Sequence, residues 1–150
     1  MKKILELSKS VSKHCVGFEG NVSSKYKNGL IIKASGTRLE SLTKKDLVFF
    51  DFKGNQLNNF KKRGSMELSF HTYLLSFDDI NYVSHTHPSN TVKILCSELS
   101  ETFAQNRLFP DQVIFNGTKS CFVPYAKPGE ELTNVIKDCI NLFIKEEKYF

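Results

Sequence analysis

The sequence has no long apolar run, and this excludes the simplest membrane architecture. No stretch of its 150 residues is apolar enough, for long enough, to cross a bilayer. The first residues, Met1–Leu7, mix charged with apolar side chains, whereas a secretion signal needs an unbroken apolar segment. They are typical of an amphipathic helix instead. The sequence therefore predicts a cytoplasmic protein that has no membrane partner.

Closely spaced cysteines are also missing. The four cysteines, Cys15, Cys96, Cys121 and Cys139, lie far apart and form no CxxC pair. Structural zinc sites usually need such pairs, and disulfides need an oxidising compartment. The sequence therefore predicts scattered, buried thiols.

A third feature that is missing is a stripe of arginines. The net charge is +5, but its lysines are dispersed, and no aromatic-basic module accompanies them. Charge bias alone is a weak signal, so this pattern favours a solvated surface over a face that binds nucleic acid. A modest positive field also attracts anionic sugars or phosphates. We predict no nucleic-acid partner.

Alternating strand and helix patterns occupy most of the chain. Strands are predicted at 21–26, 30–34, 47–52, 80–85, 112–115 and 121–125, and helices at 2–13, 66–75, 89–95 and 129–147. Asn28–Gly29 predicts a hairpin turn, Ser65 a helix N-cap, and the strand 80–85 a buried position. An early hairpin followed by alternating elements predicts an α/β fold, a layered sheet with helices on both faces.

The sharpest motif is His85-Thr86-His87-Pro88 at the end of a predicted strand. Residues i and i+2 of a strand point the same way, so both imidazoles face one side. Strand ends are common ligand positions in α/β sheets, and two converging imidazoles suit zinc or a similar ion. A pair of surface histidines is the open alternative, because catalytic zinc normally takes three protein ligands.

Glu67 stands early in the predicted helix that precedes the histidine strand, and a short loop can bring the two together. A carboxylate beside a metal can remove a proton α to a carbonyl while the metal holds the developing enolate. The alternative is an ordinary first-turn glutamate that the helix dipole favours.

Small polar loops form a third candidate feature, at Gly20–Ser23, Ser35–Gly36 and Gly64–Ser65. Backbone N–H groups and hydroxyls in such turns can hold an anion, and a helix N-terminus strengthens the effect. Plain turn chemistry is the alternative.

Together these segments resemble the N-terminal portion of the class II aldolase/adducin family in order and spacing. The segments are Gly20-Asn21-Val22-Ser23, Leu30–Thr37, Ser65-Met66-Glu67 with Phe70-His71, His85-Thr86-His87-Pro88 and Phe122–Gly129. The family includes fuculose- and rhamnulose-phosphate-type sugar aldolases, an epimerase, a dehydratase and the adducins of the cytoskeleton. The likeness covers nearly all of the chain.

The resemblance implies a three-layer α/β/α sandwich over residues 1–150, usually in a homotetramer, with a divalent metal such as Zn²⁺. By this likeness His85 and His87 are metal ligands and Glu67 is the catalytic acid/base. The substrate-binding residues would be Asn21, Ser35, Gly36 and Ser65. The implied activity is that of a lyase of carbohydrate metabolism, a metal-dependent aldehyde-lyase that cleaves a sugar, sugar phosphate or sugar acid. An epimerase or dehydratase on the same scaffold, or a non-catalytic adducin-like or truncated domain, is the alternative.

The sequence also departs from the family pattern. The family's third metal histidine lies in an Asn-His-Gly segment that this sequence lacks, so we expect a chain truncated before that C-terminal strand. Met66 replaces a serine of the aldolases' phosphate loop, which leaves room for a sugar without phosphate. The proton-donor tyrosine has no clear counterpart. His14 and His71 match no metal position, and His71 is predicted to be packed or hydrogen-bonded.

Overall fold

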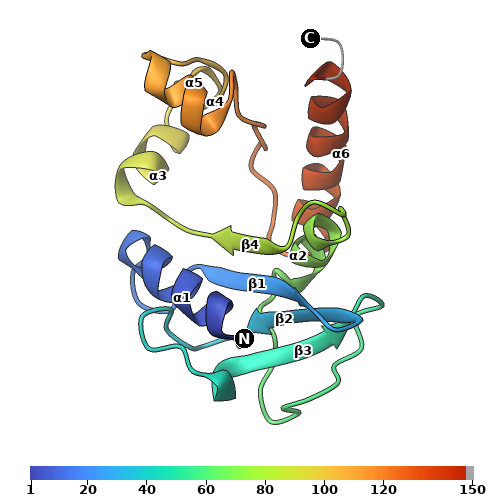
Figure 1. Cartoon of the computed structure of the whole chain (residues 1–150). Helices are drawn as coiled ribbons and strands as arrows, with labels where there is room; N and C mark the ends of the chain where they lie inside the picture. Colours follow the sequence, from blue (N-terminus) through green and yellow to red (C-terminus); the bar gives the residue numbers. More distant parts are fainter. Residues whose placement is uncertain (148–150) are drawn as a thin grey trace. The chain divides into compact units, whose positions relative to one another are not determined.

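The structure, a computed structural model, describes residues 1–147 and divides the chain into two compact units. The first unit is Met1–Pro88 and the second begins at Ser89. Figure 1 shows a sheet with helices in the first and helices alone in the second. That residues 1–150 form a single domain stays a prediction. The expected truncation after Phe150 falls outside the described residues.

A four-stranded antiparallel sheet with the order β3-β2-β1-β4 forms the centre of the first unit (Figure 1). Its strands are β1 (Asn21–Tyr26), β2 (Gly29–Lys33), β3 (Leu47–Asp51) and β4 (Tyr82–His85). The hairpin pairs Tyr26 with Gly29, so its turn is Lys27–Asn28 and not the predicted Asn28–Gly29. Gly29 lies within β2 because the sheet leaves no room there: an added Cβ would lie 2.1 Å from the carbonyl oxygen of Phe50.

Helices pack on both faces of this sheet. Helix α1 (Lys2–Val11), continued by a 3₁₀ turn η1 (Ser12–His14), joins one core cluster, and α2 (Leu68–Leu75) joins the other. Ile31 of β2 lies in the α1 cluster, whereas its neighbours Leu30 and Ile32 lie in the α2 cluster. This alternation is the period of two that a strand imposes. The first unit therefore has three layers, helix, sheet and helix.

The start of α2 differs from the prediction. The helix begins at Leu68 and Glu67 occupies its N-cap position, so Ser65 is not the cap. Ser65 lies in the turn before the helix, where its hydroxyl accepts the N–H of Glu67 at 3.3 Å. Glu67 consequently stands at the junction of turn and helix.

Strand β4 is not the buried strand that the sequence predicted. It lies at an end of the sheet order, where Val83 is buried but Tyr82 and Ser84 are exposed. An edge strand of an antiparallel sheet packs one face against a helix and leaves the other to solvent. A second 3₁₀ turn, η2 (Lys44–Asp46), precedes β3 at the opposite edge.

The second unit, as far as residue 147, is helical. Its helices are α3 (Ser89–Leu95), α4 (Ser100–Gln105), α5 (Pro110–Asn116) and α6 (Glu130–Glu147). The predicted helices 89–95 and 129–147 are confirmed, but both predicted strands are wrong, because 112–115 lies in α5 and 121–125 has no regular structure. Pro110 explains the first error, since a proline in the first turn favours a helix and donates no strand hydrogen bond.

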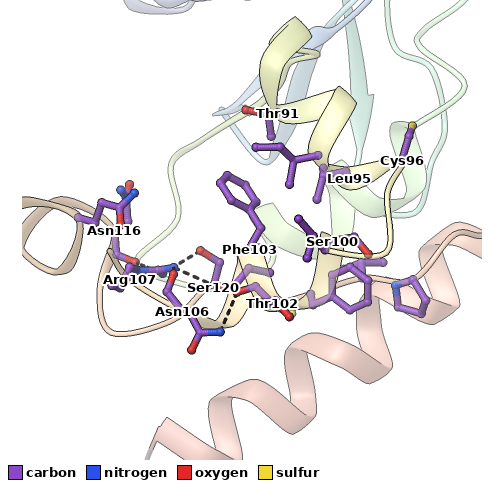
Figure 2. Close-up of a pocket in the computed structure, with 18 of the residues that line it drawn as sticks. Thr91, Leu95, Cys96, Ser100, Thr102, Phe103, Asn106, Arg107, Asn116 and Ser120 are labelled. Atoms are coloured by element: carbon purple, nitrogen blue, oxygen red, sulfur yellow. Dashed lines mark hydrogen bonds between the residues drawn. The ribbon is translucent and has the colours of Figure 1, made fainter. Parts of the chain in front are cut away.

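An apolar cavity of about 1050 Å³ lies between α3, α4, α5 and the segment 120–125 (Figure 2). Arg107 borders it, but its guanidinium donates to the Asn116 carbonyl at 3.2 Å and the Ser120 hydroxyl at 2.9 Å. This cation therefore holds the loop after α5 in place. The four cysteines are free as predicted, although none is buried. Within residues 1–147, every helix is too short or too polar to span a membrane.

Candidate functional site

The pairing of β1 with β4 positions the site on the α2 face of the sheet. Asn21 pairs with His85, and cross-strand partners project from the same face. Ser23, two residues along β1, also faces α2, where its hydroxyl lies 2.6 Å from Nδ1 of His71. The register therefore brings Asn21 and His85 together below the N-terminal end of α2, where Glu67 stands.

A chain of polar contacts joins five of the predicted site residues. The amide Nδ2 of Asn21 donates to the Ser65 hydroxyl at 3.3 Å and to the Glu67 carboxylate. The Oε2 atom of Glu67 also lies 2.7 Å from Nδ1 of His85. Beyond it, Nε2 of His85 lies 3.0 Å from Nε2 of His87, with the two rings inclined at 66°.

The other two predicted substrate residues, Ser35 and Gly36, lie in the loop after β2. The Ser35 N–H donates to the Arg63 carbonyl at 2.9 Å, and Ala34 forms a bridge with Gly64. This loop thus runs beside the segment that leads to the site. Ser35 and Gly36 are exposed. Among the described residues, the backbone N–H of Ser35 bonds to Arg63 and not to His85 or His87.

Glu67 is the charged centre of this arrangement. Burial by itself raises the pKa of Glu67, but its hydrogen bonds with His85 and Asn21 outweigh burial and hold the pKa below the usual value. The group is therefore a carboxylate at neutral pH, and it accepts the N–H of His85 Nδ1. A neutral imidazole with its proton on Nδ1 presents a lone pair at Nε2, the atom that faces His87.

The donor set of the two histidines fits a divalent metal. Zn–N bonds of about 2.0–2.1 Å from two nitrogens that lie 3.0 Å apart can meet at one point. A carboxylate behind a histidine, as Glu67 stands behind His85, is the arrangement that orients metal-binding imidazoles. Among residues 1–147, however, no three His, Cys, Asp or Glu side chains are placed so that they could hold one metal ion together. The described residues thus supply two of the three protein ligands that catalytic zinc usually takes.

Lys33, which no motif in the sequence singled out, is buried and interacts electrostatically with Glu67. Its side chain is only 3% exposed, and its ammonium donates to the carbonyls of Phe18 at 3.3 Å and Thr37 at 2.6 Å. These bonds join the loop before β1 to the loop after β2, next to two of the three segments that were predicted to hold an anion. Burial lowers the pKa of Lys33. A lysine that directly follows the apolar run Leu30–Ile32 was the signal in the sequence.

His71 is hydrogen-bonded and fully buried in α2, which confirms its prediction. Burial lowers its pKa from 6.5 to about 3, so the folded protein keeps this ring neutral. Its Nε2 finds no hydrogen-bond partner among the described residues, and the same is true of the Oδ1 atom of Asn21.

We expect His71 to make the fold sensitive to acid. Between pH 6.5 and about pH 3 the unfolded chain protonates this histidine and the folded chain does not. The unfolded state binds more protons, so the free energy of unfolding falls as the pH drops through this window. Urea titrations at several pH values should show a smaller fall for His71→Gln than for the wild type. The matched control His14→Gln removes an exposed histidine and should keep the wild-type slope; equal slopes in both variants would contradict the assignment.

A pair of facing imidazoles with a carboxylate behind one of them, on the sheet of an α/β unit, defines a candidate metal site. Comparison with known families matches residues 4–146 to the class II aldolase and adducin N-terminal domain. The chain belongs to this family, as its motifs predicted.

Three relatives illustrate the likeness. The L-fuculose phosphate aldolase of Methanococcus maripaludis is 31% identical over 130 residues, which are 85% of this chain and 68% of the relative. The structure of YgbL from Escherichia coli aligns with 94% of this chain and with 68% of the YgbL chain. The TM-score is 0.77 and the sequence identity is 22%. An L-fuculose 1-phosphate aldolase structure has a TM-score of 0.57 at 23% identity over 63% of this chain, and this chain spans 47% of its length. The structural matches establish an α/β fold like that of class II aldolases.

Proposed function

We propose that this chain acts in the metal-dependent retro-aldol cleavage of a sugar, sugar phosphate or sugar acid. One observation carries the proposal: the Glu67 carboxylate bonds to Nδ1 of His85, whose other nitrogen faces His87. The arrangement combines a charged base with two nitrogen ligands. Family membership and the fuculose phosphate aldolase relatives support a sugar as the substrate class.

The two histidines and Glu67 would divide the chemistry between them. His85 and His87 would hold Zn²⁺ or a similar ion, which when bound supplies Lewis-acid stabilisation of negative charge on a substrate oxygen. Glu67 is ionised before the reaction. Its carboxylate would accept the proton of the substrate hydroxyl as the C–C bond breaks, and would return that proton to the enolate carbon. Asn21 donates to Glu67 and so keeps the carboxylate directed at the site.

The loops around β1 and β2 would bind the rest of the substrate. Asn21 and Ser65 stand beside Glu67, and Ser35 and Gly36 lie in the loop that Lys33 anchors through Thr37. Gly36 has a φ of +72° and open space above it, so a substrate oxygen can approach its backbone closely. These hydroxyl and N–H donors suit a sugar hydroxyl, a phosphate or a carboxylate.

The proposal predicts a specific set of products. Ketoses, ketose phosphates and sugar acids, each incubated with the Zn²⁺-supplemented protein, should yield two carbon fragments from one member of the panel. An epimerase would yield an isomer, and a dehydratase would yield a product that has lost water. Treatment with a chelator should reduce the rate to background and Zn²⁺ should restore it. Cleavage that is insensitive to chelation would overturn the proposed metal role.

A second candidate is a non-catalytic, adducin-like domain. The observation that favours it is that, within residues 1–147, no three His, Cys, Asp or Glu side chains are placed to hold a metal ion together. This candidate predicts no turnover of any sugar even when Zn²⁺ is bound. The homotetramer and the cytoplasmic location also remain predictions; light scattering on the purified protein tests the first.

A further inference from the structure

Glu19 stands behind the second histidine as Glu67 stands behind the first. Its Oε2 lies 3.4 Å from Nδ1 of His87, an ion-pair distance. The other nitrogen of that ring, Nε2, faces His85. Each histidine thus directs one nitrogen at a carboxylate and the other at its partner histidine.

The backbone around Glu19 holds this carboxylate near His87. Gly17 and Gly20 flank it with φ angles of +62° and +68°, and the N–H of Glu19 donates to the Val16 carbonyl at 3.2 Å. A Cβ on Gly20 would lie 2.7 Å from the His85 carbonyl oxygen, so the loop packs directly on the end of β4. The same segment also holds the main chain of His87, whose N–H donates to the His14 carbonyl at 3.0 Å.

We propose that Glu19 is a positioning residue for His87. Its negative charge favours the proton of His87 on Nδ1 and thereby leaves the lone pair of Nε2 for the point between the two histidines. A neutral imidazole carries a single N–H, so an acceptor at one nitrogen decides which nitrogen can bind a metal. This inference rests on the proposed metal-binding function, but the distances that support it are those between the side chains of Glu19, His87 and His85.

Exposure sets the size of the expected effect. The side chains of Glu19 and His87 are 52% and 38% exposed, compared with 17% and 32% for Glu67 and His85. Solvent screens the pair, so the loss of Glu19 should act at the low end of the range for such partners, about 10-fold in metal affinity. Glutamine keeps a carbonyl acceptor but no charge, so Glu19→Gln should fall between the wild type and Glu19→Ala.

The test uses two readouts on the full chain. Competition with a chromophoric chelator measures the Zn²⁺ affinity of the wild type, Glu19→Ala, Glu19→Gln and the matched control Glu6→Ala, which removes an exposed glutamate of α1. Nitrogen-15 NMR of the imidazoles, in metal-free protein and mildly alkaline buffer, reports which nitrogen of His87 carries the proton. In the metal-free protein Nε2 of His85, 3.0 Å away, also competes for the proton of His87. We therefore expect the share of the Nδ1–H form to be equal in the wild type and in Glu6→Ala, and lower in Glu19→Ala.

The two readouts separate the possible failures. If Glu19→Ala keeps both the Zn²⁺ affinity and the His87 tautomer of the control, the positioning role of Glu19 is overturned. If the tautomer responds to Glu19→Ala but the wild type binds no Zn²⁺, the positioning role stands and the proposed metal function fails. Circular dichroism verifies that each variant retains the fold.

Discussion

Replacing Glu67 with glutamine should lower the rate of sugar cleavage by about a thousandfold, within the range that a positioned acid or base contributes. Glutamine has the same size, but it cannot accept the proton that the carboxylate takes. Its amide oxygen can still accept the N–H of His85 Nδ1, so the ring should keep its orientation. We therefore expect the Zn²⁺ affinity of Glu67→Gln to stay within about 10-fold of the wild type.

The experiment pairs steady-state rates with metal affinity for Glu67→Gln and for Glu6→Gln. The control makes the same chemical change at an exposed position of α1, so its rate and affinity should match the wild type. Normal turnover by Glu67→Gln would show that this carboxylate is not the acid/base. A complete loss of bound metal would instead make Glu67 chiefly a support for His85.

Replacing both His85 and His87 with alanine should abolish metal binding. We expect about one Zn²⁺ per wild-type chain and none above background in the double variant, because two of the ligands that hold the ion are removed. Atomic absorption on dialysed protein measures the metal content. His14→Ala is the control, because it removes an exposed histidine and should leave the metal content unchanged.

The two single variants should differ in a second property. His85→Ala removes the hydrogen-bond partner of a half-buried carboxylate, so it should lower the free energy of unfolding as well as the metal affinity. His87→Ala leaves the bond between Glu67 and His85 intact and should lose metal with little change in stability. Metal retained at the wild-type level in the double variant would place the metal elsewhere in the protein.

Local patterns in the sequence predicted correctly those helices and strands whose packing in the fold favours the same structure. Strands β1, β2 and β3 and helices α1, α3 and α6 all lie where the sequence patterns placed them. Three errors came from context: the turn at Lys27–Asn28, the cap at Ser65 and the segment 112–115. In each case a local preference of about 1 kcal/mol competed with packing or with a proline, and the stronger constraint prevailed.

The candidate site also combines residues that the sequence indicated with residues that only the fold revealed. Short motifs and the family resemblance singled out Asn21, Glu67 and the histidine pair as candidate site residues, and the structure places them in contact. No motif indicated Glu19, because a single glutamate in a loop carries no signal until its neighbours are known. Lys33 carries a weak signal, since it ends the apolar strand β2, but that signal does not reveal its partners. Their roles depend on contacts with Phe18, Thr37 and His87 that only the folded chain creates.

The sequence by itself determined the family, the period of each main element and the residue types available for chemistry. Only the tertiary structure decided how those residues meet. The antiparallel register of β1 and β4 places Asn21 opposite His85, and the turn at Ser65 delivers Glu67 to the same place. Distances between segments remote in sequence arise from strand pairing and core packing, which sum over many weak contacts that no local pattern contains.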